Sequence, residues 1–414
     1  MSSEEAAGKR VSWVELYFDL IFVFAVGQLS HLMVADPHWG GLGRALGLFI
    51  PLWWTWIGFA VLYNRHGEDR TSQRLLVLAG TLPCAVAAIE THAAAGGHGM
   101  AFTFALAGAR LILALAFAFT AGQARRVALG YGLSTVAFAV SAFVPSPWRY
   151  SLWAIALLQE AGFLLLRDGE HAHERSGQHP PARRSRTESV RAMFRPPADP
   201  ARRVDASHLA ERFGLMIIIL LGEVVVAVAA SAAGVPEHGP QYWLGLLAGL
   251  VLAGALWWIY FTAAAPISEY VLRASGGNPA MAYGLYAGGH LSPAFSLLTM
   301  AAGVSLVLSG AAPAAAAWFI TGGLASYLLG LRVVAIDAGL RFGPLRRVAV
   351  VAVTVCFAFL EPLISATGVA MVTAAWAVAL AVYVTRRIPD RLKGVTADPL
   401  SYFRAASGLP AERG

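Results

Sequence analysis

Long apolar runs constrain this chain more than any other feature of its sequence. The run from 241 to 265, QYWLGLLAGLVLAGALWWIYFTAAA, has no charged side chain. An α-helix needs about 20 apolar residues to cross the roughly 30 Å hydrocarbon core of a bilayer. Only 13% of the 414 residues are charged, against about 25% in soluble domains. The sequence therefore predicts an all-α integral membrane protein rather than a set of soluble domains.

Hydropathy and length predict about twelve membrane-spanning helices. Two of the expected spans, 126–144 and 368–385, are short, and only the letters SATG separate the last two. The expected spans are residues 14–35, 41–63, 72–95, 100–121, 126–144, 148–167, 208–232, 241–265, 280–308, 314–336, 345–366 and 368–385.

Basic residues collect in alternate connections between the spans. Arginines are found in the segments 65–74, 125–126, 168–207 and 341–347, whereas connections such as DPHWGG, VPSPW and SGAAP have almost none. By the positive-inside rule, we expect a plasma-membrane protein with both termini on the cytoplasmic side. Orientation in the membrane thus explains the net charge of +7 better than nucleic-acid binding does.

The two halves of the chain show weak similarities in the same order. Glu15 matches Glu211 at the entry to a span, and Gly27-Gln28 matches Gly222-Glu223 near its middle. Six expected spans precede the segment 168–207 and six follow it, which predicts two parallel six-helix repeats. The predicted organisation is a cytoplasmic tail (1–12), a first repeat (13–167), an Arg- and Pro-rich cytoplasmic linker without ordered structure (168–207), a second repeat (208–386) and a second cytoplasmic tail (387–414).

Two carboxylates, Glu15 and Asp19, lie in the first apolar run, WVELYFDLIFVF. A charged side chain costs about 2.5–3.5 kcal/mol at the centre of a membrane helix. The spacing Ser12-x-x-Glu15 fits a capping box, in which Glu15 accepts a hydrogen bond from the backbone at the helix start. Asp19 lies one turn deeper on the same face. We therefore expect one of the two acids to be protonated or paired with a cation from another helix, and Asp19 to face the interior between the two halves.

Other polar residues in the spans are candidates for binding a substrate or an ion. Glu223 lies within IIILLGEVVVAV, near the middle of its span, and Gln28 is its counterpart in the first half. Glu223 needs a partner on another helix or must be neutral; a purely structural hydrogen bond between helices is the alternative. Arg110 and Arg332, each in the fourth span of its half, are expected partners for the buried acids. Glu211, the counterpart of Glu15, completes the set.

Sequence patterns for several kinds of chemistry are missing. The chain has no GxxxxGK[ST] loop, no HExxH and no GxSxG, and Cys84 and Cys356 lie in apolar runs without a CxxC spacing. We expect no cofactor and no metal. The expected partners are membrane lipids and either protons or a small ion or solute, with no nucleic acid; the oligomeric state stays open.

The segments VELYFDLIFVFAVGQLSHLM and ERFGLMIIILLGEVVVAV resemble the two signatures of the bacterial low temperature requirement protein A (LtrA) family. The resemblance covers about residues 11–386. It implies an integral membrane protein named for growth in the cold and implies no particular biochemical activity. The motif residues that it carries over are Glu15, Phe18, Asp19, Glu211, Arg212, Gly214, Gly222 and Glu223. Val224 follows Glu223 where family members tend to have a small polar residue, which argues against a hydroxyl-lined site there.

Three classes of function fit these observations. The first, which we favour, is a secondary transporter or ion-coupled permease, because proton- or cation-coupled transport needs carboxylates inside the membrane. The second is a membrane-embedded lipid-handling enzyme that uses the interfacial residues Glu15, Glu211 and Arg212. The third is a non-catalytic membrane sensor or scaffold in cold or stress adaptation, in which the acids serve stability only.

Overall fold

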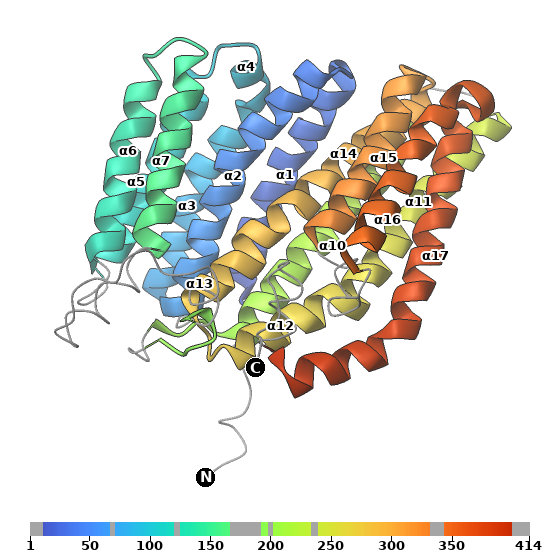
Figure 1. Ribbon diagram of the computed structural model, residues 1–414. Coiled ribbons are helices and arrows are strands. Elements are labelled where there is room, and N and C mark those ends of the chain that lie inside the picture. The colour runs from blue at the N-terminus through green and yellow to red at the C-terminus, as the bar shows by residue number, and fades with distance from the viewer. Residues whose placement is uncertain are drawn as a thin grey trace. The chain divides into compact units, whose positions relative to one another are not determined.

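The described chain is built from helices (Figure 1). The computed structural model describes residues 11–66, 71–119, 125–165, 192–197, 202–232, 239–331 and 343–399, and no strand occurs among them. Large apolar side chains on many helices are exposed, such as Leu82 at 70% and Leu158 at 72%. Exposed apolar surface on this scale is stable against lipid and not against water. The expectation of an all-α membrane protein is confirmed.

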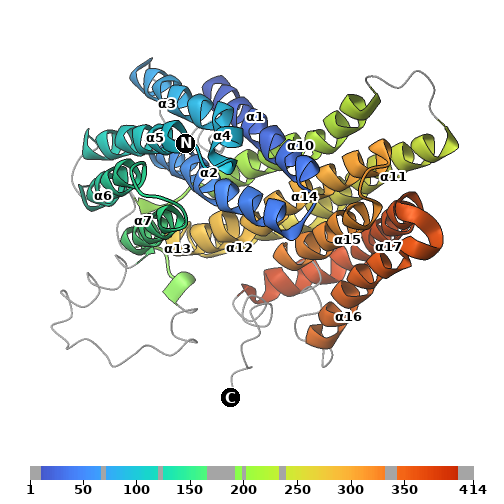
Figure 2. The same ribbon diagram turned by 90° about the horizontal axis from the view of Figure 1, so that it is seen from above.

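The chain divides into two compact units, of which the first comprises Met1–Leu29, Leu46–Arg212 and Ser275–Ala287. Within it, α5, α6 and α7 pack side by side, and α3 packs on α5 (Figure 1, Figure 2). Its helices are most of α1 (Trp13–Ala35) and α2 (Trp39–His66), then α3 (Thr71–Ile89), α4 (Thr91–Ala95), α5 (Met100–Phe119), α6 (Arg125–Ser141), α7 (Trp148–Leu165), the first turns of α10 (Ala206–Ala232), α13 (Pro279–Ala282) and most of the π-helix η3 (Tyr283–Gly288).

The second unit comprises Ser30–Ala45, Phe213–Ala274 and Gly288–Gly414. In this unit α14 and α15 form the most extensive helix pair, and α11 packs on α17. Its elements are the end of α1, the start of α2 and the rest of α10, then α11 (Pro240–Ile259), the π-helix η2 (Tyr260–Ala264), α12 (Ala265–Ala274), α14 (Gly289–Ser309), α15 (Pro313–Gly330), α16 (Gly343–Cys356), the 3₁₀ turn η5 (Phe357–Leu360) and α17 (Glu361–Ala397).

The expected spans coincide with helices in the described residues. Seven helical segments there are long and apolar enough to cross a membrane. The helices α6, α7, α10 and α15 occupy four further expected spans without meeting that criterion, α6 because it has only 17 residues. Ser365 has a φ of 66°, so the backbone is not helical at this point of α17. Ser365 belongs to SATG, the segment expected to separate the last two spans. The total of twelve and the two-repeat arrangement stay predictions.

Small residues allow α14 and α15 to pack closely. A Cβ atom on Gly323 would lie 2.5 Å from Cγ of Met300, and one on Gly303 would lie 2.8 Å from Cγ1 of Ile320. In lipid, close van der Waals contact replaces the hydrophobic effect as the main attraction between helices. Glycines at these two positions therefore fix how near the two helices approach.

Parts of the predicted linker are ordered, in contrast to the expectation. Asn278 caps α13 through its Oδ1 and donates from Nδ2 to the Arg195 carbonyl at 2.7 Å. The Val204 amide donates to the Gly277 carbonyl at 3.0 Å. Residues 192–197 and 202–207 thus pack within the first unit, because one asparagine satisfies both a helix start and the linker backbone. Linker residues 168–191 and 198–201 lie outside the described residues.

Candidate functional site

Glu15 is buried at the start of α1 and accepts hydrogen bonds on both carboxylate oxygens. Oε2 accepts from the Ser12 amide at 3.0 Å, which confirms the capping interaction expected from the spacing. The same oxygen accepts from Nε2 of His208 at 3.3 Å, and Oε1 pairs with Nη1 of Arg212. Glu15 therefore does more than cap a helix, since it also joins α1 to α10.

Asp19 is buried one turn deeper and pairs with the same arginine. Its Oδ1 accepts from Nη2 of Arg212 at 3.1 Å and from the indole Nε1 of Trp56 at 2.7 Å. The Arg212 guanidinium also lies 5.5 Å from the centroid of the Trp56 ring, within the range of a cation–π contact. Oδ2 of Asp19 and Nε of Arg212 are buried and have no hydrogen-bond partner among the described residues.

The hydrogen bonds of Asn64 determine which nitrogen of His208 carries a proton. Oδ1 of Asn64 accepts from the Asp205 amide and Nδ2 donates to the Asp205 carbonyl, both at 3.0 Å, which fixes the orientation of the side-chain amide. Nδ2 also lies 3.0 Å from Nδ1 of His208. A ring nitrogen that faces an N–H donor must accept, so Nδ1 is unprotonated and Nε2–H donates to Glu15. In this arrangement His208 is neutral.

These residues form a buried cluster whose formal charges do not cancel. We call Glu15, Asp19, Trp56, His208 and Arg212 the Arg212 cluster; all five belong to the first unit. It contains two carboxylates and one guanidinium, and each of these three side chains is at most 1% exposed. With His208 neutral, two ionised acids would leave one excess negative charge in a dry environment, which is costly. Counted over the described residues, the cluster therefore needs one bound proton or cation to be neutral.

A second buried ion pair in the first unit is balanced. Nε of Arg110 donates to Oε1 of Glu160 at 2.8 Å, and Nη1 donates to Oγ1 of Thr55 at 3.0 Å. The guanidinium also lies 4.0 Å from the centroid of the Phe138 ring. We call these four residues the Arg110 cluster. It contains one acid and one cation, both about 1% exposed, so it is neutral without a further ligand.

Helix α2 links the two clusters through adjacent residues. Thr55 contacts Arg110, and Trp56 contacts Asp19. Trp56 also stacks on Trp53 with ring centroids 5.3 Å apart. The Trp53 indole in turn donates to the Ala287 carbonyl at 3.0 Å. These two tryptophans of WWTW therefore serve packing and hydrogen bonding around the charges.

The second unit holds Glu223 and a separate histidine–tyrosine pair. Glu223 is 5% exposed in α10 and has no hydrogen-bond or ion-pair partner among the described residues. Nε2 of His290 lies 2.9 Å from the Tyr260 hydroxyl, and the Phe213 ring packs edge-on against the imidazole. Tyr260 begins η2, and His290 follows η3. π-Helical turns are frequent at functional sites, which makes this pair a further point of interest.

The remaining candidates from the sequence are separate from the charged clusters. Glu211 is exposed, and its Oε2 accepts from the Val11 amide at 3.3 Å. Gln28 is half-buried in α1. Arg332 lies outside the described residues. Arg110, expected as a partner for a buried acid, pairs with Glu160, whereas Asp19 pairs with Arg212.

The sequence contains a signal that could have identified the partner of Asp19. Glu15 and Asp19 are four residues apart on α1, and His208 and Arg212 are four residues apart on α10. Residues at this spacing share a helix face, so the two pairs present complementary groups at matching intervals. Trp56 and Asn64 have no comparable signal. Among the described residues, no three His, Cys, Asp or Glu side chains lie close enough together to hold a metal ion.

Comparisons with known proteins agree with the two signatures in the sequence. Residues 10–384 match the family described as bacterial low temperature requirement A protein (LtrA). One similar protein is the uncharacterized protein RA0937 of Rhizobium meliloti (strain 1021), 27% identical over 270 residues, which are 63% of this chain. This chain spans 60% of the length of that relative. No solved structure matches the chain. Since the family match covers nearly all of the membrane region and includes Glu15, Asp19, Arg212 and Glu223, this chain belongs to the LtrA family.

Proposed function

We propose that this protein is an ion-coupled secondary transporter in which Asp19 carries the coupling proton or cation. The observation that carries this proposal is the charge of the Arg212 cluster, where two buried carboxylates face one guanidinium. The described residues supply no second fixed cation to this site. A site with an excess negative charge takes up a proton or a cation, and proton- or cation-coupled transport requires such uptake and release.

Asp19 is the better carrier of the two acids. Among the described residues, Glu15 is held by hydrogen bonds to the start of α1, to His208 and to Arg212. Asp19 keeps one oxygen, Oδ2, without a partner among the described residues, and a proton on that oxygen would leave the bonds of Oδ1 unchanged. With Asp19 protonated, Arg212 has only Glu15 as an ionised partner; with Asp19 ionised, Arg212 must hold both acids.

This difference gives ion binding a way to change the conformation. The strength of the attraction between α1 and α10 at this point depends on whether Asp19 is ionised, because Arg212 belongs to α10. A bound ion shifts a conformational equilibrium only if it interacts differently with the two states. The shared guanidinium provides such a difference. Glu223, buried on the same helix without a described partner, is the candidate for a second ion-binding residue.

Finer features of the architecture belong to this proposal. The transporter has about twelve spans arranged as two parallel six-helix repeats, with both termini in the cytoplasm. Matching entry residues in the two halves, Glu15 and Glu211, and the alternation of basic connections support this arrangement. Its partners are membrane lipids and protons or a small ion or solute.

Ion flux in proteoliposomes of phosphatidylethanolamine and phosphatidylglycerol tests the proposal. A pH-sensitive dye inside the vesicles reports flux after an imposed proton or cation gradient. Wild type should move the ion, whereas Asp19→Asn and Glu223→Gln should abolish flux at equal folded yield. Glu269→Gln is the matched control, because Glu269 is a surface acid that pairs with Arg273 on α12.

The variants separate transport from mere stability. Flux in Asp19→Asn equal to wild type would remove Asp19 from the coupling step. A wild type that is silent under proton, sodium and potassium gradients would contradict ion coupling and favour the lipid-handling or sensor alternatives.

A further inference from the structure

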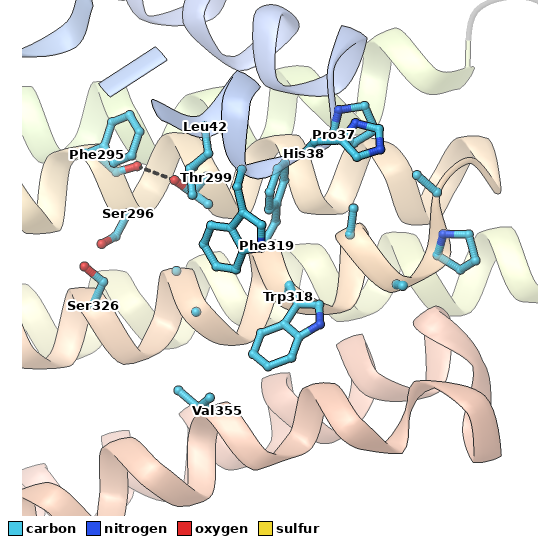
Figure 3. A pocket seen from close by; sticks show the side chains of 17 residues that line it. Pro37, His38, Leu42, Phe295, Ser296, Thr299, Trp318, Phe319, Ser326 and Val355 are labelled. Carbon is cyan, nitrogen blue, oxygen red and sulfur yellow. Dashed lines mark hydrogen bonds between the residues drawn. The ribbon is translucent and has the colours of Figure 1, made fainter. Parts of the chain in front are cut away.

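A cavity of about 650 Å³ in the second unit has an almost entirely apolar lining. Its wall includes the rings of Trp39, Phe295, Trp318 and Phe319, together with Gly322 on α15. Figure 3 shows the rings of Phe295, Trp318 and Phe319. Its volume lies within the range of roughly 300–1,000 Å³ that is typical of sites for small molecules. Trp39 is 77% exposed and Phe319 only 6%, so the cavity opens to the surroundings at one side and reaches into the packed interior at the other.

The polar groups in this cavity require no polar ligand. The hydroxyls of Ser296 and Thr299 donate to carbonyls one turn earlier in α14, those of Ser292 and Phe295, at 2.7 and 3.0 Å (Figure 3). The hydroxyl of Ser326 bonds to that of Ser292 at 2.9 Å. A ligand that fits this lining is therefore apolar along the length that it buries.

One end of the cavity lies at a helix terminus with charged neighbours. His38 lines the cavity in the short connection between α1 and α2, and its Nδ1 lies 2.9 Å from Oδ1 of Asp36. Asp36 also pairs with Arg44. The lining along α15 runs from Pro313, at the helix start, to Ser326, a distance of about 20 Å along the axis at 1.5 Å per residue. This length is comparable with the thickness of one leaflet, which is half of a hydrocarbon core roughly 30 Å thick.

From this geometry we propose that the cavity binds one acyl chain of a membrane phospholipid, with the headgroup beside His38, Asp36 and Arg44. An acyl chain is apolar over about the thickness of a leaflet, and its headgroup lies where helices end. The cavity matches this arrangement, because it has a polar end at the connection between α1 and α2 and an apolar interior. This site is separate from the proposed ion carrier, and neither proposal depends on the other.

Photo-crosslinking in vesicles tests the site directly. The full chain is reconstituted in phosphatidylcholine with a small fraction of phosphatidylcholine that carries a diazirine in one acyl chain. After irradiation, mass spectrometry of the peptides locates the labelled residues. We expect labels concentrated on residues 295–299 and 318–326, and competition by excess unlabelled phospholipid.

Two variants distinguish the cavity from the general lipid surface. A Cβ atom on Gly322 meets nothing within 4 Å and Gly322 lines the cavity, so we expect the side chain of Gly322→Leu to occupy part of the cavity. Labelling of these peptides should fall roughly fivefold or more, because several buried methylene contacts are lost. Gly254→Leu is the matched control, since Gly254 on α11 has equally open space and does not line the cavity.

The results decide between one site and ordinary solvation by lipid. Labels spread over exposed leucines and valines of many helices, or unchanged in a folded Gly322→Leu, would overturn the proposal. Competition by a free fatty acid or an isoprenoid alcohol and not by phospholipid would also overturn it, because the occupant would be a different molecule. If Gly322→Leu does not fold, the peptide map and the competition in wild type decide alone.

Discussion

The Arg212 and Arg110 clusters differ by a single carboxylate. Both are buried in the first unit, both centre on a guanidinium, and both place an aromatic ring near it. Arg110 faces one acid, Glu160, and Arg212 faces two, Glu15 and Asp19. Burial and pairing with a guanidinium are common to both clusters and therefore do not distinguish them. The ratio of acids to cations decides whether a buried cluster can be complete without a mobile charge.

The largest effect is expected from removing the cation that serves two acids. Arg212→Gln leaves Glu15 and Asp19 buried without a positive partner, and loss of one member of a buried pair costs about 3–5 kcal/mol. We expect little folded protein, measured by size-exclusion chromatography in detergent. Arg273→Gln, which breaks an exposed pair on α12, should change the free energy of unfolding by less than about 1 kcal/mol. If Arg212→Gln unfolded at the wild-type temperature, the cluster would carry no buried charge.

The next effect is a difference between Glu160→Gln and Asp19→Asn in the free energy of unfolding. This difference tests the charge count of the two clusters. Each variant removes one negative charge from a buried cluster while keeping the shape of the side chain. Glu160→Gln leaves the Arg110 cation unbalanced and should lower the free energy of unfolding by about 3–5 kcal/mol. Asp19→Asn removes the excess charge and should change it by less than about 1 kcal/mol, since the Trp56 indole keeps an acceptor. Thermal unfolding of both in one detergent compares them directly. Equal losses of unfolding free energy in the two variants would contradict the excess negative charge that we assign to the Arg212 cluster.

Among the variants that remove a partner of a buried charge, the smallest effect is expected at His208. If this histidine is a neutral donor to Glu15, as the contact with Asn64 indicates, then His208→Gln keeps a donor and costs only about 1–2 kcal/mol. The same unfolding measurement applies, with Arg212→Gln as the reference for a lost cation. A loss as large as that of Arg212→Gln would mean that His208 is an imidazolium ion and that the cluster is already balanced.

Local patterns predicted much of the fold and part of the site. Apolar runs of about 20 residues predict helices because a membrane leaves the backbone few alternatives, and the long helices among the described residues fall where those runs lie. The spacing of Ser12 and Glu15 predicted a helix cap because a capping box involves only four residues. The predicted disorder of the linker failed at residues 192–197, because the stabilising partner, Asn278, is far away in the sequence.

The sequence by itself determined that this chain is a helical membrane protein of the LtrA family with two acids in its first span. Only the tertiary structure decided which cation those acids meet, and that Arg110 belongs to a different, balanced pair. The physical reason is that hydropathy and capping act over a few residues of one helix, whereas a buried charge is neutralised by groups from other helices. Asp19 and Arg212 are 193 positions apart, and the packing of α1, α2 and α10 brings them together with Trp56.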